Sequence, residues 1–181
     1  MKLALIVGHS AEKKGAHNTK YKVYEYDFNL KFAERLKFEL DKIAIGLETE
    51  IIFRDTYNNL PHKVNEHKPD FIISLHCNAF DQKASGSEVL YYHTSVMGKA
   101  LAKALQQQIT HALRLPDRGI KPLVRQDRGG YLLKNTLAPC VITEPFFIDN
   151  NRDLSRACKQ MDNLISAYIH AISNYCKALT Q

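Results

Sequence analysis

The sequence predicts an α/β fold built on a largely parallel sheet. Short apolar runs end at turn or polar residues, and amphipathic helical stretches lie between these runs. Strands that alternate with helices are typical of parallel sheets, because two parallel strands need a crossover connection, which is usually a helix. The chain has 181 residues with no linker, internal repeat or low-complexity segment, so we expect a single domain that spans residues 1–181.

Runs of strand-forming residues mark the predicted strands. The first run, Leu3–Val7, is apolar throughout, which is typical of a strand buried on both faces. Pro122 has no backbone N–H to donate to a neighbouring strand, so the segment that contains it is expected at an edge of the sheet. The predicted strands cover residues 3–7, 50–54, 71–75, 87–92, 119–125 and 140–143, and residues 10–19 are predicted to form a loop.

Apolar residues at helical spacing predict the helices between the strands. Phe28, Phe32, Leu36 and Leu40 recur at every fourth position, which gives one face of a helix an apolar surface. Ser95 is a suitable N-cap for a long helix that follows it. The predicted helices cover residues 25–42, 61–67, about 97–113, and a closing helix with apolar positions from 154 to 172.

Composition and charge restrict the class of partner. With 45% hydrophobic and 24% charged residues, the chain has the composition of an ordinary globular protein. A net charge of +6 favours an anionic partner such as nucleic acid, phospholipid or cell wall. Lys and Arg are scattered and lack the interleaved aromatic residues of a nucleic-acid groove, so we expect no nucleic-acid partner. No segment approaches the ~20 apolar residues of a membrane helix, so we expect no membrane insertion.

The first residues and the cysteines indicate where the chain is made. The apolar run Leu3–Val7 is too short for the core of a signal peptide, and Gly8-His9 ends it. The four cysteines form no CxxC pair, which favours reduced thiols in a reducing compartment. We therefore expect synthesis in the cytoplasm, and we expect a monomer.

Three polar residues stand where apolar strands are predicted to end: His9, His76 and Glu144. In open α/β sheets, ligands bind in the crevice outside the carboxyl ends of the strands, so these side chains are expected along one edge of the sheet. Glu25 starts the helix after the first loop and can face the same edge. Taken singly, each residue has a simpler interpretation as a surface group, a helix cap or an ion-pair partner. Only their joint placement suggests a site.

Two histidines and two glutamates in one crevice suit a catalytic zinc site. Such a site has three protein ligands and leaves a fourth position to water. The cation lowers the pKa of this water to about 7, and a carboxylate that does not bind the metal can take the proton and pass it to the leaving group. The residue types therefore fit metal-assisted amide hydrolysis, although position alone leaves a purely structural role open.

Five short segments carry recognisable motifs in order along the chain. The most specific is residues 68–79, where a Ser-x-His-x-Asn core follows a Pro-Asp strand. The others are Ile6–His9 with Gly15-Ala16, Glu25 with Phe28–Leu30, residues 86–92, and residues 144–150. Together these segments resemble the zinc-dependent N-acetylmuramoyl-L-alanine amidases of the type 3 amidase family. The resemblance runs from Leu3 to about Asp153.

This resemblance implies a fold, an activity and roles for the site residues. The implied fold is a twisted, mostly parallel sheet flanked by helices, in agreement with the prediction above. The implied zinc ligands are His9, Glu25 and His76, and Glu144 is the implied general base and acid. The implied reaction is zinc-dependent hydrolysis of the amide bond between N-acetylmuramic acid and L-alanine in peptidoglycan.

The chain departs from the family pattern in two places, and these departures keep other functions open. Ser10 follows the first histidine where the family usually has Gly, and Pro145-Phe146 follows the catalytic glutamate where the family usually has Gly at the second position. A changed backbone there could shift Glu144, which would leave a catalytically weak peptidoglycan-binding or regulatory domain. A zinc peptidase that cuts within the stem peptide is a further alternative, because both bonds are amides.

Two segments near the predicted site are open to interpretation. Residues 125–134, with Gly129-Gly130, are expected to form a mobile rim, and Arg125 within them is either a contact for an anionic stem peptide or a solvated strand end. Asn78 either points its amide at the substrate or holds its own loop.

The expected setting of the enzyme follows from the missing export signal. A small wall amidase without such a signal fits a phage or prophage lysis enzyme, an endolysin that acts on the cell wall after release. The net charge of +6 would help adsorption to an anionic wall, and salt should weaken this adsorption.

Overall fold

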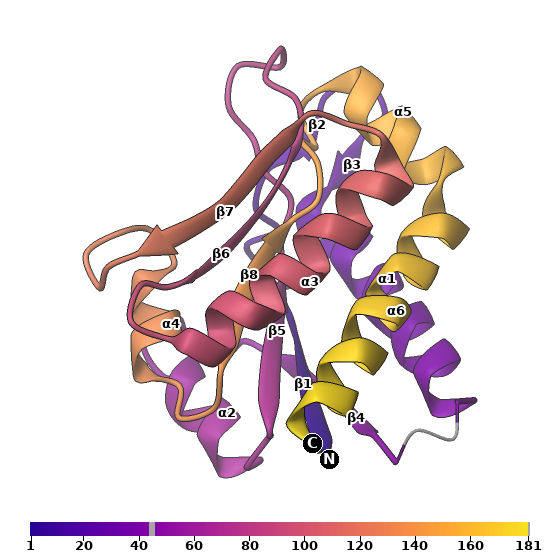
Figure 1. Cartoon of the computed structure of the whole chain (residues 1–181). Helices are drawn as coiled ribbons and strands as arrows, with labels where there is room; N and C mark the ends of the chain where they lie inside the picture. Colours follow the sequence, from indigo (N-terminus) through magenta and orange to yellow (C-terminus); the bar gives the residue numbers. More distant parts are fainter. Residues whose placement is uncertain (44–45, 181) are drawn as a thin grey trace.

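The computed structural model describes residues 1–43 and 46–180. A six-stranded sheet in the order β4-β1-β5-β8-β6-β7 forms its centre, and helices cover both faces (Figure 1). The strands of this sheet are β1 (Lys2–Val7), β4 (Glu48–Phe53), β5 (Phe71–Leu75), β6 (Ser87–Tyr92), β7 (Asp117–Leu123) and β8 (Cys140–Glu144). The helices are α1 (Glu25–Asp41), α2 (Leu60–Glu66), α3 (Val96–Leu113), α4 (Gly130–Asn135), α5 (Asn151–Lys159) and α6 (Met161–Leu179).

Each face of the sheet has its own apolar core. Leu3, Leu5 and Val7 of β1 pack with residues of α1, α3 and α6 on one face. Ala4 and Ile6 of the same strand pack with residues of α2 and α4 on the other. Successive side chains of a strand point to opposite faces, so a strand covered on both sides has a continuous apolar sequence. This confirms the prediction of a buried strand at Leu3–Val7.

The strand directions confirm the predicted α/β fold with a mostly parallel sheet. Neighbouring strands β4, β1, β5 and β8 run parallel to one another. Strand β6 runs antiparallel to β8, and β7 runs parallel to β6. Pro122 lies in β7 at an edge of the sheet, as predicted, although this strand covers Asp117–Leu123 and not residues 119–125.

Most predicted helices are found, but the predicted closing helix is two helices. The α1 and α2 helices lie within a residue or so of their predicted bounds, and the Ser95 hydroxyl accepts a hydrogen bond from the Gly98 N–H at the start of α3. At the end of the chain, Asn150 caps α5, and the backbone leaves the helical conformation at Gln160 before α6 begins. The break escaped prediction because apolar residues continue at helical spacing across it.

Three short elements were not predicted. Strands β2 (His17–Asn18) and β3 (Val23–Tyr24) form a small antiparallel pair, so the segment predicted as a loop at residues 10–19 contains a strand. Helix α4 lies within the segment expected as a rim. Elements of two to six residues are too short to show a hydrophobic period, so only their tertiary contacts reveal them.

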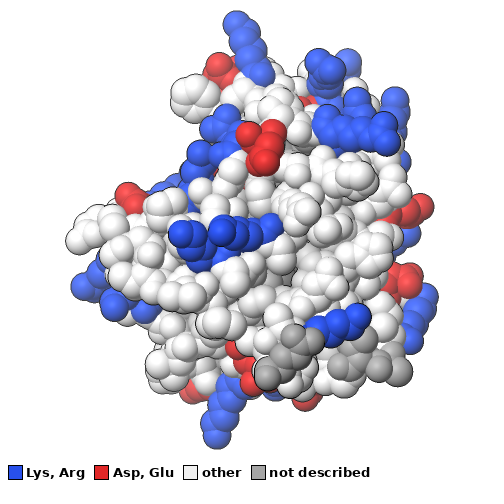
Figure 2. Space-filling model, in the orientation of Figure 1, with Lys and Arg blue, Asp and Glu red and all other residues white. Residues whose placement is uncertain are grey.

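The surface view agrees with the scattered basic residues of the sequence. On the face that Figure 2 shows, Lys and Arg are dispersed among uncharged and acidic residues and form no continuous basic stripe. In the part of the chain that the structure describes, no helix combines the length and apolarity needed to cross a membrane.

Candidate functional site

The register of three parallel strands places their carboxyl ends side by side. Val7 and Leu75, the last residues of β1 and β5, are paired, and Leu75 is also paired with Thr143, which precedes the last residue of β8. His9 and His76 follow two of these strands and Glu144 ends the third, so the structure brings them to one edge of the sheet, as the sequence predicts. Gly8 allows the close approach, because a Cβ there would lie 2.5 Å from the carbonyl oxygen of Leu75.

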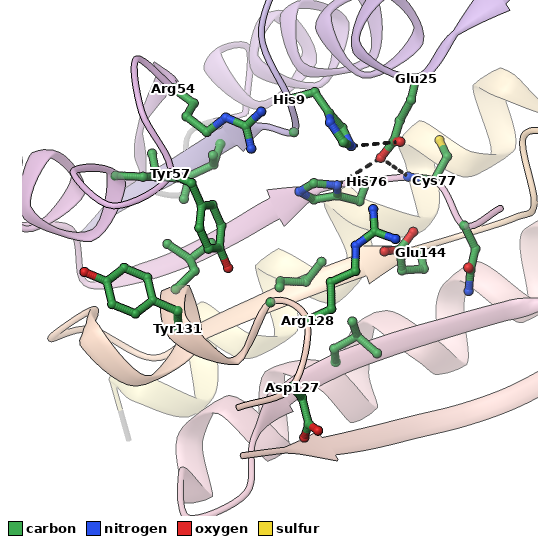
Figure 3. A pocket seen from close by; sticks show the side chains of 18 of the residues that line it. His9, Glu25, Arg54, Tyr57, His76, Cys77, Asp127, Arg128, Tyr131 and Glu144 are labelled. Atoms are coloured by element: carbon green, nitrogen blue, oxygen red, sulfur yellow. Dashed lines mark hydrogen bonds and ion pairs between the residues drawn. The ribbon is translucent and has the colours of Figure 1, made fainter. Parts of the chain in front are cut away.

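Glu25 reaches the same edge from the first turn of α1. Its carboxylate lies between two imidazoles, with Oε2 2.9 Å from His9 Nε2 and Oε1 2.9 Å from His76 Nδ1 (Figure 3). The backbone N–H groups of Ala16 and Cys77 donate to the same carboxylate, at 3.2 and 3.0 Å. Glu25 is only 2% exposed, so its carboxylate is held in place from several sides.

The donor atoms of His9, Glu25 and His76 lie within 4.8 Å of one another, a grouping that could hold a metal ion. The contact between His9 Nε2 and Glu25 lacks hydrogen-bond geometry, so this buried nitrogen has no hydrogen-bond partner among the described residues. Buried polar atoms normally find a partner, and a bound cation would supply one here. Two imidazoles with one carboxylate are a donor set of catalytic zinc sites. The residues present therefore fit a zinc ion.

The charge state of Glu25 suits this interpretation. Burial opposes ionisation, but the hydrogen bond to His76 and the nearby imidazoles of His76 and His9 outweigh burial and hold the pKa of the Glu25 carboxyl well below its usual range. The carboxylate is therefore ionised at neutral pH, which is the form that binds a cation.

Glu144 lies close to this group without belonging to it. One of its carboxylate oxygens, Oε2, is shielded from solvent and has no hydrogen-bond partner in the described parts of the chain. Burial raises the pKa of the Glu144 carboxyl well above its usual value, and the carboxylates of Glu25 and Glu88 raise it further. Glu144 is thus a carboxyl group that can hold or release a proton close to the three candidate ligands.

Glu88 is a site residue that the sequence analysis missed. Because β6 is antiparallel to β8, the start of β6 lies at the functional edge, and Glu88 is paired with Glu144 in the sheet. The Glu88 carboxylate accepts a hydrogen bond from the Asn78 side-chain amide at 2.7 Å and pairs with Arg118 at 2.8 Å. Asn78 also accepts from the backbone N–H of Ala79, so its contacts fit the loop-holding role.

These residues line a pocket of about 660 Å³, within the size range of small-ligand sites. Arg54, Tyr57, Arg128 and Tyr131 line the side of the pocket that faces the histidines (Figure 3). The Tyr57 and Tyr131 ring centroids are 5.8 Å apart. Arg128 and Tyr131 belong to the segment 125–134 that was expected as a rim, although neither was singled out, whereas Arg54 and Tyr57 were not predicted at the site.

The thiol of Cys77 lies next to a candidate ligand, His76, but it is not a member of the candidate metal group found among the described residues. It is buried, and its Sγ lies 3.6 Å from the Asn29 side-chain oxygen. Burial raises the pKa of this thiol well above its usual value, and the Glu25 and Glu144 carboxylates add to the effect, so the group remains a neutral thiol.

Pro145-Phe146 joins the end of β8 to the apolar core. The Phe146 ring is fully buried and packs edge-on against Phe28, with centroids 5.0 Å apart. The carbonyl of Pro145 accepts a hydrogen bond from the Ser87 hydroxyl at 2.6 Å, and that of Phe146 accepts one from the Asn78 N–H at 3.0 Å. The departure from the family pattern therefore leaves Glu144 in the sheet and facing the pocket.

The segment expected as a rim does lie at the pocket. Residues 125–129, Tyr131 and Leu132 are among those that line it, and Arg125 is one of them. The segment divides into a turn and helix α4, which packs on the same face of the sheet as α2 (Figure 1).

Fold and site together define an α/β protein with a candidate His/Glu metal centre at the carboxyl edge of a mostly parallel sheet. The sequence matches the N-acetylmuramoyl-L-alanine amidase family over residues 3–174, and the chain belongs to this family. The family membership indicated by the sequence motifs is thus confirmed.

Two relatives and two solved structures illustrate the similarity. N-acetylmuramoyl-L-alanine amidase LytC of Bacillus subtilis is 28% identical over 82% of this chain, and probable cell wall amidase LytH of Staphylococcus aureus is 32% identical over 83% of it. The matched regions cover only 30% and 49% of those two proteins.

Among solved structures, an N-acetylmuramoyl-L-alanine amidase from Clostridium difficile 630 has a TM-score of 0.83 at 23% identity, over 97% of this chain and 96% of that one. The catalytic domain of the CD27L endolysin, which targets Clostridia Difficile, has a TM-score of 0.81 at 28% identity, over 96% and 97% of the two chains. These matches confirm the fold.

Proposed function

We propose that this chain hydrolyses the amide bond between N-acetylmuramic acid and L-alanine in peptidoglycan, with zinc as its cofactor. The observation that carries the proposal is the Glu25 carboxylate held between His9 and His76, with the Glu144 carboxyl beside them at the same sheet edge. Family membership supports the choice of bond.

In this proposal, His9, Glu25 and His76 hold the zinc ion. When bound, zinc polarises the scissile carbonyl and acidifies the attacking water. Glu144 does not bind the metal, and its carboxylate takes a proton from the attacking water and returns it to the leaving L-alanine nitrogen. The raised pKa of Glu144 suits this exchange, because a group that binds its proton more firmly is a stronger base.

We further propose that the protein acts as a monomer on the cell wall after release from the cell in which it is made, as an endolysin would. The similarity to the CD27L endolysin catalytic domain supports this setting. The net charge of +6 supports adsorption to an anionic wall.

The test is digestion of purified peptidoglycan by the zinc-loaded protein, with and without a chelator, followed by mass spectrometry of the products. We expect free stem peptides that begin with L-alanine, and their absence under chelation. Glu144→Gln should lower the rate by about a hundredfold or more, which is the lower end of the contribution of general acid–base catalysis.

Other products would change the assignment. Peptides cut within the stem would identify a peptidase. An absence of products from a zinc-loaded protein, across several wall types, would favour a peptidoglycan-binding domain, and Pro145-Phe146 would then be the first segment to revert to the family pattern.

A further inference from the structure

Three arginines line the pocket without an acidic partner. Arg54 follows β4, and Arg125 and Arg128 lie in the turn between β7 and α4. Within residues 1–43 and 46–180, none of these three side chains forms a hydrogen bond or an ion pair. By contrast, Arg118 next to the pocket is neutralised by Glu88 at 2.8 Å. None of these three charges is held in an ion pair among the described residues, so they are available to an anionic ligand in the pocket.

Two of these arginines point at the candidate reaction centre. The guanidinium group of Arg54 extends toward His9, and that of Arg128 extends toward His76 and Glu144 (Figure 3). Asp127, the acidic neighbour of Arg128, points away from the centre and does not neutralise it (Figure 3).

The two arginine charges also act on one neighbouring group. Burial raises the pKa of the Tyr57 hydroxyl, and the positive charges of Arg54 and Arg128 both oppose this rise. Arg54, Arg128 and Tyr57 all line the same pocket, so the two guanidinium groups border one ligand space.

The turn that carries Arg128 has a fixed backbone. The Asp127 carboxylate accepts a hydrogen bond from the Val124 N–H at 2.8 Å, and the Asp127 carbonyl accepts one from the Gly130 N–H at 2.9 Å. At Gly130 an added Cβ would lie 1.9 Å from the Val124 carbonyl oxygen, so the backbone of this turn packs against itself. Arg128 thus lies on a hydrogen-bonded turn that lines the pocket.

We propose that Arg128 and Arg54 bind a carboxylate of the stem peptide, so that the protein prefers stems whose second residue keeps a free α-carboxylate over stems in which this group is amidated. This inference rests on the proposed function. A guanidinium fork matches a carboxylate with two parallel hydrogen bonds, whereas a neutral amide offers one acceptor oxygen and no charge.

The geometry of the substrate places such a carboxylate within reach. In a peptidoglycan stem, L-alanine is followed by D-glutamate joined through its side-chain carboxyl, so its α-carboxyl is either free or amidated. A residue spans at most ~3.6 Å, so this group lies within about 7 Å of the nitrogen released from the sugar. A stem bound with its scissile bond at His76 and Glu144 can therefore extend its first carboxylate toward the two arginines, whose guanidinium groups point at this centre (Figure 3).

The same charges have a second possible role, which the test separates from the first. A guanidinium close to Glu144 could stabilise negative charge on the reacting carbonyl. That role would speed hydrolysis of carboxylate and amide stems alike, because the scissile bond is the same in both. Recognition of the carboxylate, by contrast, changes the ratio of kcat/KM between the two substrates.

The experiment uses two soluble muramyl pentapeptides that differ only at the D-glutamate α-carboxyl, which is free in one and amidated in the other. We expect the zinc-loaded protein to show a kcat/KM at least about tenfold higher for the free carboxylate, the factor expected for a charged hydrogen bond. Arg128→Gln should reduce this preference about tenfold, and Arg128→Lys should retain part of it because the charge remains. Arg54→Gln tests the second arginine in the same way.

Arg152→Gln is the matched control. It removes the same charge from an exposed position on α5 that does not line the pocket, and both rates should stay at the wild-type values. Calorimetric titration of both peptides into Glu144→Gln protein provides a readout that needs no turnover, and the free carboxylate should bind about tenfold more tightly.

Each outcome decides the matter. Equal kcat/KM and equal Kd for the two peptides would overturn the inference, as would Arg128→Gln lowering both rates by the same factor. If neither peptide is cleaved while the carboxylate form still binds more tightly, the proposed hydrolase function fails and the recognition by arginine stands. If the peptides are cleaved without preference, the hydrolase function stands and this inference fails.

Discussion

Glu144 has no hydrogen bond or ion pair among the described residues, although the positive charge of Arg128 opposes part of the rise in its pKa. Its Oε2 atom is shielded from solvent and unsatisfied among the described residues, and two further carboxylates lie near it. Burying a charge in this way opposes folding unless the group takes up a proton. A role in catalysis explains this arrangement, because a general base with a raised pKa accepts a proton more readily.

This reasoning predicts that Glu144→Gln stabilises the metal-free protein at neutral pH. The folded-state pKa of Glu144 lies above the unfolded value, so the stability due to its proton is present below the unfolded pKa and is lost as pH rises toward the folded pKa. At about pH 7 the glutamine variant should gain at least about 1 kcal/mol, or ~2–4 °C in Tm.

The measurement is thermal unfolding with a chelator between about pH 4.5 and 7.5. The advantage of Glu144→Gln over wild type should shrink toward the acid end. Glu34→Gln removes a carboxylate from an exposed position of α1 and should change Tm little at any pH. A glutamine variant no more stable than wild type at neutral pH would contradict the account.

Substitutions at two glycines can distinguish the effect of backbone strain from an effect on the candidate metal ligands. Gly15 and Gly119 have nearly the same left-handed backbone, with φ of +76° and +77°. An added Cβ at Gly15 would lie 2.5 Å from His9 Cδ2 and 2.7 Å from Glu25 Oε2, whereas nothing lies within 4 Å at Gly119. The first loop therefore has to pass directly over the candidate ligands, and only glycine permits this.

We predict that Gly15→Ala and Gly119→Ala each destabilise the protein by about 1 kcal/mol through backbone strain. Only Gly15→Ala should also weaken zinc binding, by about tenfold or more, because it displaces two ligands. Competition with a chromogenic chelator measures the affinity. Equal affinities for the two variants would show that the His9–Glu25 contact does not depend on the glycine.

At the scale of elements, strand direction decides which site residues a sequence can reveal. His9, His76 and Glu144 could be predicted because they follow apolar strands that run parallel, and parallel strands gather their carboxyl ends. Glu88 could not, since it starts a strand, and only the antiparallel pairing of β6 with β8 brings that start to the same edge. The segment that contains Arg128 was expected as a rim of the site, but no pattern in the sequence shows that the side chain of Arg128 faces the pocket.

The fold likewise contains elements that the sequence reveals and elements that it does not. Buried strands and long amphipathic helices were predicted close to their observed bounds because each has a hydrophobic period over several residues. The β2–β3 pair, helix α4 and the break at Gln160 have no such period. Family resemblance supplied the roles of the four central residues, which position in the sequence alone had left undecided.

The loop after β5 is tied to the segment after β8 by one buried carboxylate. Asp153 at the start of α5 is fully buried and accepts hydrogen bonds from the Ser85 hydroxyl and from the N–H groups of Gly86 and Phe147. Three chain segments therefore meet at one side chain, close to the two strands that carry Glu88 and Glu144.

We predict that Asp153→Ala lowers the free energy of unfolding by about 3 kcal/mol, because it leaves buried donors without an acceptor. Asp162→Ala is the control, because Asp162 forms an exposed ion pair with Arg35 on the α6 surface and should contribute less than about 1 kcal/mol. Urea unfolding measures both. Similar losses for the two variants would show that Asp153 is not the connection described here.

At the scale of the whole molecule, the candidate metal group links distant parts of the fold. His9 follows β1, Glu25 starts α1 and His76 follows β5, so a cation bound by all three would fasten two central strands to the helix that packs against them. In the unfolded chain no preformed site holds these three residues together, so the ion binds the folded state more tightly. Metal binding should therefore add directly to the stability of the fold.

We predict that zinc at a hundred times its Kd raises the free energy of unfolding by about 2.7 kcal/mol, or roughly 5–11 °C in Tm for a chain of this size. Glu25→Gln should abolish most of this rise, because it removes the only charged ligand. Arg152→Gln, which lies outside the site, should keep all of it. Thermal unfolding over a zinc titration measures the effect, and calorimetry at low temperature supplies the Kd independently. A Tm that does not respond to zinc in the wild-type protein would contradict the metal-centre assignment itself.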